Sequence, residues 1–216
     1  MNIEYARRQM VEQQVRTWDV FDSAVLSALS SVPREQFVAA GYESLAFADV
    51  ELPIGHGQRM MTPTLEGRML QALEVKPGDS VLEIGTGSGF VTACLARLAG
   101  KVTSVDIHQD FLDTAEANLA DCGISNVGLA LMDATRELPD GTYDVVAVTG
   151  SIETYDPRYA RALKPGGRLF VIVGTEPLMD ARLVHRLNEE EWHTASIFET
   201  CVAALINGSL PPQFHF

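Results

Sequence analysis

The sequence predicts an α/β fold of the Rossmann-like kind, with a mostly parallel seven-stranded sheet and helices on both of its faces. From Ser80 onward, apolar runs of strand length alternate with helical patterns, and this alternation is typical of a parallel sheet covered by crossover helices. The end of the chain differs, because two extended runs, 192–198 and 201–206, follow each other with almost nothing between them. These runs predict a closing hairpin, so we expect an antiparallel C-terminal strand.

The segment before Ser80 is predicted to be a helical extension. Residues 3–16 carry apolar residues at near-helical spacing. Asp22 is placed to cap a second helix, and Thr62 followed by Pro63 is a good helix start, because proline fits the first helical position. Residues 41–64 are irregular and contain several glycines and prolines, which predicts mostly loop.

The remaining elements follow the alternation. We expect strands near 80–84, 101–106, 127–132, 143–149 and 167–173, and helices near 88–98, 110–122, 155–162 and 178–188. No internal repeat or clear linker divides the chain. Residues 1–216 are therefore predicted to form a single domain, with an extension over 1–75 packed on a core over 76–216.

Composition narrows the classes of partner. The 216 residues are 46% hydrophobic and 21% charged, as in an ordinary globular protein, and the formal net charge is −13. Because an acidic surface repels nucleic acid, we expect no nucleic-acid partner. The first residues lack the apolar core of a signal peptide, and no apolar run is long enough to span a bilayer. We therefore expect no membrane partner and a cytoplasmic location. The three cysteines and five histidines lack ligand spacing, so no metal site is expected.

A glycine-rich turn follows the first strand of the predicted sheet. The apolar run 81–84 leads into Gly85, Gly87 and Gly89, and a helical pattern opens near Phe90. This layout brings backbone N–H groups and a helix N-terminus against a charged ligand. The Gly-x-Gly-x-Gly spacing differs from the dinucleotide pattern, and by itself it also suits a simple tight turn.

Two acids favour a ligand site over a simple turn. Glu83 ends an apolar strand, where a bare carboxylate is costly without a partner, and Asp106 ends the next strand at the distance expected of a ribose-binding acid. This set resembles the class I S-adenosylmethionine-dependent methyltransferases, and the resemblance implies S-adenosyl-L-methionine as the cofactor. The contacts it implies are Glu83, Gly85, Thr86, Gly87 and Gly89 for the methionine end, Asp106 for the ribose, and Ile107, Asp133 and Ala134 for the adenine.

Three blocks narrow the resemblance to one family. Residues 28–38, 52–58 and 82–90 are similar, in order and spacing, to motifs of the protein-L-isoaspartate O-methyltransferases. The resemblance implies methylation of the free carboxylate of damaged aspartyl residues, for protein repair, with an isoaspartyl protein or peptide as substrate. We also expect a lid over the sulfonium and the acceptor, in which Thr62 is the candidate catalytic residue because it offers a hydroxyl one position after Met61. The lid residues are Gln58, Met60, Met61 and Thr62. The sequence is compatible with a monomer and with a homodimer.

The acceptor side departs from the family pattern. Met60 and Met61 stand where the family has a small hydroxyl residue, and methionine donates no hydrogen bond. Glu153 lies in a loop that is usually small and apolar, and Thr200 to Leu205 lacks the usual arginine and proline. Two alternatives stay open: a diverged relative with a more apolar small-molecule acceptor, and a catalytically silent cofactor-binding module. A nicotinamide dehydrogenase fits poorly. The tail 211–216 either packs on the chain or a partner, or forms a flexible end.

Overall fold

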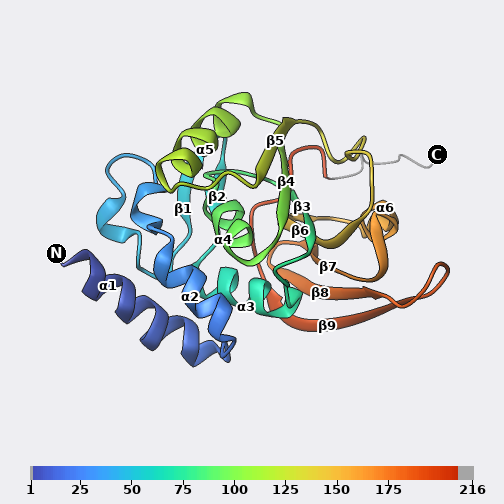
Figure 1. Ribbon diagram of the computed structural model, residues 1–216, viewed down its shortest axis with the longest axis horizontal. Coiled ribbons are helices and arrows are strands. Elements are labelled where there is room, and N and C mark those ends of the chain that lie inside the picture. Colours follow the sequence, from blue (N-terminus) through green and yellow to red (C-terminus); the bar gives the residue numbers. More distant parts are fainter. Residues whose placement is uncertain (1, 209–216) are drawn as a thin grey trace.

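The computed structural model describes residues 2–208, so the prediction for the tail at 211–216 lies outside the described residues. Its main elements are labelled in Figure 1. The helices are α1 (Ile3–Gln9), α2 (Ser23–Ser31), α3 (Pro63–Leu73), α4 (Phe90–Leu98), α5 (Gln109–Asp121) and α6 (Pro157–Arg161). The strands are β1 (Leu52–Gly55), β2 (Gln58–Met60), β3 (Ser80–Ile84), β4 (Lys101–Asp106), β5 (Val127–Leu131), β6 (Tyr143–Ile152), β7 (Leu163–Thr175), β8 (Leu178–Arg186) and β9 (Trp192–Thr200).

The central sheet has seven strands in the order β5-β4-β3-β6-β7-β8-β9. The first five of these pair in parallel, and β8 is antiparallel to both of its neighbours. From β3 the chain moves outward to β4 and β5 and then returns to the other side of β3 as β6, so the strand order reverses between β3 and β6. Open α/β sheets bind ligands at the carboxyl ends of the strands beside such a reversal. The predicted fold class is confirmed, and the reversal marks where to look for the site.

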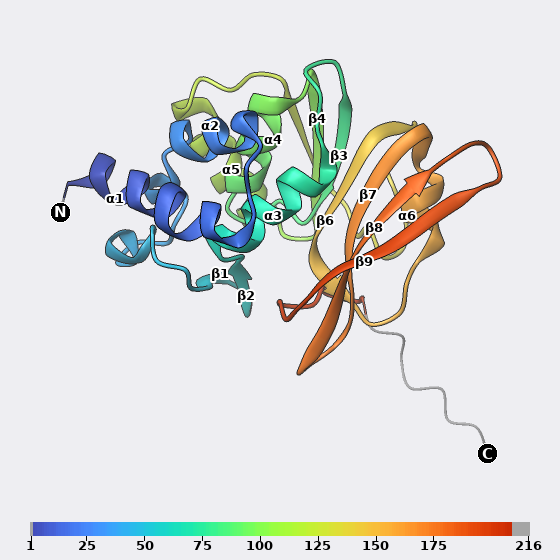
Figure 2. The same ribbon diagram turned by 90° about the horizontal axis from the view of Figure 1, so that it is seen from below.

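The two faces of the sheet carry different layers. Figure 2 shows α2, α3, α4 and α5 on one side of the sheet and α6 on the other. Strand β3 illustrates the division, because Val81 faces the first layer while Leu82 and Ile84 face the second. Side chains alternate between the faces of a strand, so neighbouring residues enter different cores. Glu83, two residues after Val81, therefore points toward the helix layer that contains α4.

The predicted helix starts are confirmed by their caps. The Asp22 carboxylate accepts hydrogen bonds from the N–H groups of Ala24 and Val25 at the start of α2, at 2.8 and 3.0 Å. The Thr62 hydroxyl accepts from the N–H of Leu65 at 3.3 Å, with Pro63 at the first position of α3. Each cap satisfies N–H groups that the first turn of a helix leaves without partners.

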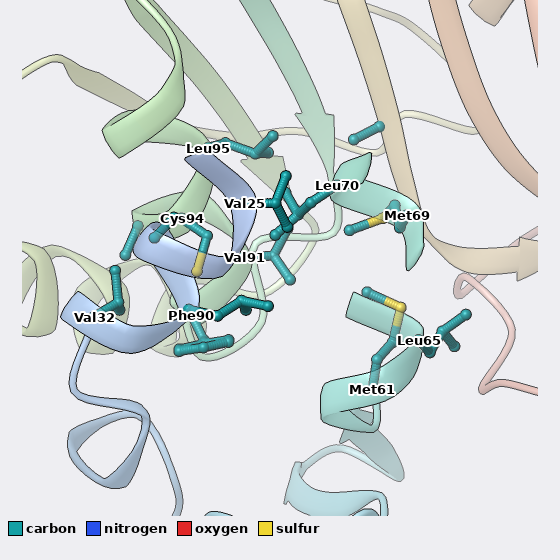
Figure 3. Packing of buried hydrophobic residues seen from close by; sticks show 14 of the residues in the cluster. Val25, Val32, Met61, Leu65, Met69, Leu70, Phe90, Val91, Cys94 and Leu95 are labelled. Carbon is teal, nitrogen blue, oxygen red and sulfur yellow. The ribbon is translucent and has the colours of Figure 1, made fainter. Parts of the chain in front are cut away.

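The N-terminal segment packs on α3 and α4 around a buried arginine. Figure 3 shows side chains from the three regions in one cluster, including Val25, Val32, Met61, Leu65, Phe90 and Cys94. Arg34 is fully buried beside this cluster and forms an ion pair with Glu66 of α3. Its guanidinium also donates to the carbonyls of Ala46 and Met61, at 2.9 and 2.8 Å. One side chain thus ties the extension to the loop that enters α3.

Two predictions near the C-terminus are wrong. The segment 178–188, predicted as a helix, is strand β8, and the closing hairpin is β8–β9 rather than 192–198 with 201–206. The apolar positions Met179, Ala181 and Val184 suit either period over so short a segment. The free edge of β7 selects the strand over the helix, because β8 pairs with residues Arg168 to Thr175 of β7 and satisfies their backbone groups. No helix within residues 2–208 is long and apolar enough to cross a membrane.

Candidate active site

A cavity of about 730 Å³ lies at the carboxyl ends of the parallel strands, beside the reversal between β3 and β6. The loop after β3 contributes Gly85 and Gly87, the end of β4 contributes Asp106, and the end of β6 contributes Thr149 and Gly150. A second cavity of about 330 Å³ adjoins the first and shares several of its lining residues.

The glycine loop is shaped by backbone that other residues would not tolerate. Gly85 has φ +98°, and a Cβ atom placed there would lie 2.4 Å from the Thr149 hydroxyl. Gly89 has φ +85°, and its Cβ would lie 2.9 Å from the Cβ of Ala115 in α5. Positive φ and close packing both select glycine. The loop therefore lies tight against β6 on one side and α5 on the other, which leaves bare backbone facing the cavity.

Asp106 is held rigidly at the end of β4. Its two carboxylate oxygens accept hydrogen bonds from the N–H groups of Gly87 and His108, at 2.9 and 3.0 Å. The residue is buried and lines the cavity. These two bonds fix the carboxylate between the glycine loop and the start of α5. A preorganised acceptor of this kind suits the hydroxyls of a sugar.

Past Asp106 the cavity wall becomes apolar. Ile107, Met132 and Ala134 line it, and Asp133 stands between the last two. The Asp133 carboxylate accepts from the N–H and hydroxyl of Thr135 at 3.1 and 2.6 Å. Burial would raise the pKa of Asp133, but these hydrogen bonds, a bond from the Asn207 amide and the charge of Arg136 outweigh it and the pKa is lowered. Asp133 is therefore a fixed anion at the rim of an apolar slot.

Glu83 lies beneath the glycine loop rather than in the cavity wall. It is fully buried, and one of its oxygens accepts from the hydroxyls of Thr92 and Ser104. Burial raises its pKa to about 8, against those two hydrogen bonds, which lower it. The other carboxyl oxygen has no hydrogen-bond partner within the described residues. The structure thus places a carboxyl that favours its neutral form between the loop and α4.

The hairpin β1–β2 covers one side of the cavity. Gln58, Arg59 and Met61 line it, whereas Met60 is buried in the core and lines only the adjoining cavity. Met60 is buried beneath the hairpin and does not reach the main cavity. The Met61 backbone is anchored from below by Arg34.

Thr62 caps helix α3 and does not line either cavity. Its hydroxyl lies 3.1 Å from that of Thr64, which donates to Asp49 at 2.8 Å. Since the Thr64 proton is engaged by Asp49, the Thr62 hydroxyl is the donor of that pair. The structure therefore gives Thr62 a capping role, and a catalytic role for it stays a prediction.

The opposite wall comes from the end of the chain. The segment 201–206 runs beside β6, with the N–H of Ser151 bonded to the Ala203 carbonyl at 3.0 Å and the N–H of Leu205 bonded to the Ser151 carbonyl at 2.9 Å. Gly150 permits this approach, because a Cβ there would lie 2.8 Å from the Leu205 side chain. Val202, Ala203, Leu205 and Ile206 form an apolar surface of the cavity. Glu153 is exposed and lies outside it.

The tip of the β1–β2 hairpin is fastened to α5 by two histidines. The rings of His56 and His108 stack at 3.8 Å and 9°, and His56 bonds to Asp110 at 2.8 Å. These three groups lie close enough to suggest a cation site. However, nitrogen lone pairs lie in the ring planes, so two parallel rings do not direct them at one point. The stack instead holds the hairpin over the cavity, beside Phe111.

The structure brings most of the predicted site residues together. Those that line the main cavity are Gln58, Met61, Gly85, Gly87, Asp106, Ile107, Asp133 and Ala134. Met60 and Thr86 line only the adjoining cavity, and Glu83, Gly89 and Thr62 line neither. Sequence reasoning missed Glu51, Arg59, His108, Phe111 and Thr149, which also line the main cavity. Arg59 had a usable signal, since it lies between two residues that were predicted.

The fold and the site fit a class I S-adenosylmethionine-dependent methyltransferase, because the parallel sheet places a glycine loop and a strand-end acid beside one ligand cavity. The sequence profile described as protein-L-isoaspartate(D-aspartate) O-methyltransferase (PCMT) matches residues 6–208. The chain belongs to this family, and the predicted resemblance and the predicted class of enzyme and cofactor are confirmed.

Individual relatives agree with the family match. A protein-L-isoaspartate O-methyltransferase of Methanoculleus marisnigri is 38% identical over 202 residues, which cover 93% of this chain and 91% of that protein. One of Koribacter versatilis is 34% identical over 181 residues, 83% of this chain and 82% of that protein. A crystal structure of a Plasmodium falciparum protein of the same description, in complex with S-adenosyl-L-homocysteine, has a TM-score of 0.79 and covers 92% of this chain and 97% of that chain. At 18% identity, that likeness shows the fold alone.

Proposed function

We propose that this protein transfers a methyl group from S-adenosyl-L-methionine to the free carboxylate of an isoaspartyl residue in a protein or peptide, as a step of protein repair. Membership of the family supports the reaction. The observation that carries the proposal is that one cavity is lined both by Asp106, whose carboxylate is held by backbone N–H groups, and by the β1–β2 hairpin.

The donors around the cavity fit the cofactor. Asp106 offers a fixed carboxylate for ribose hydroxyls, and the apolar slot of Ile107 and Ala134 suits a purine ring beside the Asp133 carboxylate. Bare backbone at Gly85 and Gly87 allows a close approach by the methionine end. Glu83, Thr86 and Gly89 would act from beneath, by holding the loop in place. Gln58 and Met61 would cover the reacting end, with Met60 packed behind them.

The proposed chemistry needs no general base. A carboxylate is ionised at neutral pH, since its pKa is about 4. The bound cofactor supplies a sulfonium methyl group, which an acceptor oxygen takes as the carbon–sulfur bond breaks and its electron pair stays on sulfur. The protein has to align that oxygen and exclude water, so proximity is the main source of rate. The apolar surface of Val202, Leu205 and Ile206 provides a dry wall for this purpose.

The test is methyl transfer from labelled S-adenosyl-L-methionine to an isoaspartyl peptide, with the matched aspartyl peptide as the control. We expect label in the isoaspartyl peptide only. If the protein binds the cofactor and methylates neither peptide, the proposal fails. The same labelled assay with small apolar carboxylic acids then tests the diverged acceptor, and failure of every acceptor leaves the silent module.

A further inference from the structure

We propose that Arg59 binds the carboxylate of the methyl acceptor and so selects an anionic acceptor in this protein. The inference rests on the proposed function and names a residue for the half of the site that departs from the family pattern. It concerns the step at which the acceptor is held, before the methyl group is transferred.

Arg59 is placed where the acceptor has to enter. It lies on β2 opposite Pro53, in the hairpin that covers the cavity, and its side chain is exposed. It lines both cavities, together with Gly85 and Thr149, which both cavities share. The Arg59 side chain is therefore accessible to solvent and also contributes to the walls of both cavities. A long side chain at such a mouth meets the incoming substrate before the substrate reaches the reacting end.

Among the described residues that line the main cavity, Arg59 is the only lysine or arginine. Arg59 forms no ion pair with any residue of 2–208. Its charge acts on Glu51, whose pKa is raised chiefly by burial, while Arg59 lowers that pKa and Glu176 raises it. The guanidinium is thus free to pair with a ligand.

Gln58 and Thr149, the other side-chain donors beside Arg59 in the cavity lining, already make hydrogen bonds within the protein. The Gln58 amide donates to the Ala204 carbonyl at 3.3 Å. The Thr149 hydroxyl donates to the carbonyls of Ile84 and Gly85, at 2.9 and 2.7 Å. Met61 donates no hydrogen bond. An acceptor carboxylate that enters against the apolar wall needs a donor, because burying a charge without one is costly. Arg59 meets this need with a positive charge that no ion pair within residues 2–208 engages.

The chemistry of arginine suits the task. Its planar guanidinium can donate two parallel hydrogen bonds to one carboxylate, and such charge-assisted bonds are about twice as strong as neutral ones. A pair of this kind orients the acceptor and rejects neutral analogues, which cannot complete it. The hydroxyl that the family resemblance led us to expect is replaced, on this reasoning, by a cation from the neighbouring strand position.

The test compares wild type with Arg59→Met, which keeps the apolar stem and removes the charge. Arg59→Lys keeps the charge without the fork, and Arg161→Met, at an exposed position of α6, is the matched control. For the isoaspartyl peptide, we expect Arg59→Met to lower kcat/KM about 10- to 100-fold, chiefly through KM, as loss of a charged hydrogen bond does. Arg59→Lys should recover part of the loss, and Arg161→Met should behave like wild type.

Calorimetry supplies a readout besides activity. With S-adenosyl-L-homocysteine present, the isoaspartyl peptide should bind Arg59→Met more weakly, while an analogue whose free carboxylate is a carboxamide should bind both proteins alike. The cofactor also carries a carboxylate, so the affinity for S-adenosyl-L-homocysteine alone is measured in each variant. If Arg59→Met binds S-adenosyl-L-homocysteine more weakly while its KM for the peptide is unchanged, Arg59 contacts the cofactor instead and the inference is overturned. Equal peptide kinetics in wild type and Arg59→Met would also overturn it, while inactivity of wild type would instead sink the proposed function.

Discussion

The two halves of the cavity are built in different ways. In the cofactor half, the Asp106 carboxylate accepts hydrogen bonds from the N–H groups of Gly87 in the glycine loop and of His108. Asp106 ends β4 and the glycine loop follows β3, and these are neighbouring strands of one sheet. In the acceptor half, the β1–β2 hairpin meets the segment 201–206, and the bond from Gln58 to Ala204 joins residues 146 positions apart. One half is fixed by the sheet, and the other is assembled from two distant peripheral segments.

This difference explains which half can change. The geometry of the glycine loop depends on residues that admit no Cβ, so substitution there disturbs the backbone itself. The acceptor half presents side chains from a hairpin and from a terminal segment, and these can vary while the sheet stays intact. Of the departures from the family pattern, Met60, Met61 and 200–205 fall on that side, whereas Glu153 is exposed and lies outside the cavity. A cofactor site can therefore be preserved while the acceptor is selected by new side chains.

The largest expected effect comes from the support beneath the hairpin. Arg34→Met removes a fully buried guanidinium and leaves Glu66 as an unpaired buried acid, so we expect the free energy of unfolding to fall by about 3–5 kcal/mol. The measurement is urea unfolding at neutral pH. Arg182→Met, which breaks a partly exposed pair with Asp180, is the control and should cost about 1 kcal/mol or less. Equal losses in the two variants would mean that Arg34 does not anchor the acceptor half.

The next effect is confined to the cofactor half. Asp106→Ala removes the acceptor of two backbone bonds and the predicted ribose contact, so we expect the affinity for S-adenosyl-L-homocysteine to fall about 10- to 100-fold with the fold retained. Calorimetry gives the affinity, and circular dichroism checks the fold. Asp113→Ala, an exposed acid that accepts from Gln109, serves as control and should bind as wild type does. Unchanged affinity in Asp106→Ala would refute the ribose assignment.

A smaller effect appears as pH dependence. The pKa of Glu83 is about 8 in the folded protein and about 4.3 in the unfolded chain, so between these values the folded state holds the proton that the unfolded state has lost. Its contribution therefore makes the free energy of unfolding fall as pH rises through this window, by at most about 1.4 kcal/mol per pH unit. Glu83→Gln should show a shallower fall than wild type in urea unfolding from pH 5 to 8. Parallel curves would contradict the buried neutral carboxyl, and exposed Glu116→Gln on α5 is the control.

The smallest effect is expected from a substitution that changes only the shape of a buried side chain. Met61→Leu keeps an apolar side chain of similar volume at a buried position, so we expect a loss of less than about 1.5 kcal/mol in stability and an unchanged affinity for the cofactor product. Thermal unfolding and calorimetry measure the two quantities. A large fall in cofactor affinity would show that the sulfur of Met61 is itself a contact, and the division between the halves would be less sharp than the structure indicates.

The cofactor half was largely predictable from the sequence because it is local. Strand 80–84, its glycines and the acid at 106 lie within one strand–helix–strand unit, and short-range patterns report such units well. The side to which Glu83 points was not predictable in the same way. It depends on which face of β3 meets α4, and that is settled by packing rather than by the motif.

The acceptor half and the end of the sheet needed the structure. The segment 178–186 suits a helix or a strand by its apolar spacing, and only the free edge of β7 selects the strand. Arg59 and the wall at 202–206 meet through contacts between segments far apart in the chain, which no local pattern encodes. The capping role of Thr62, in contrast, was predictable from the local pair Thr62-Pro63. Its hydroxyl accepts from the N–H of Leu65 and lies against the Thr64 hydroxyl, so the group that a catalytic role would use is already engaged.

The most direct test of this division is to titrate S-adenosyl-L-homocysteine by calorimetry into Asp106→Ala and Arg59→Met side by side, with wild type as the reference. We predict that Asp106→Ala alone loses affinity, because the cofactor half is fixed by the sheet and Arg59 serves the acceptor. A comparable loss in both variants would show that the two halves form one cofactor site, and it would contradict the division of the cavity drawn here.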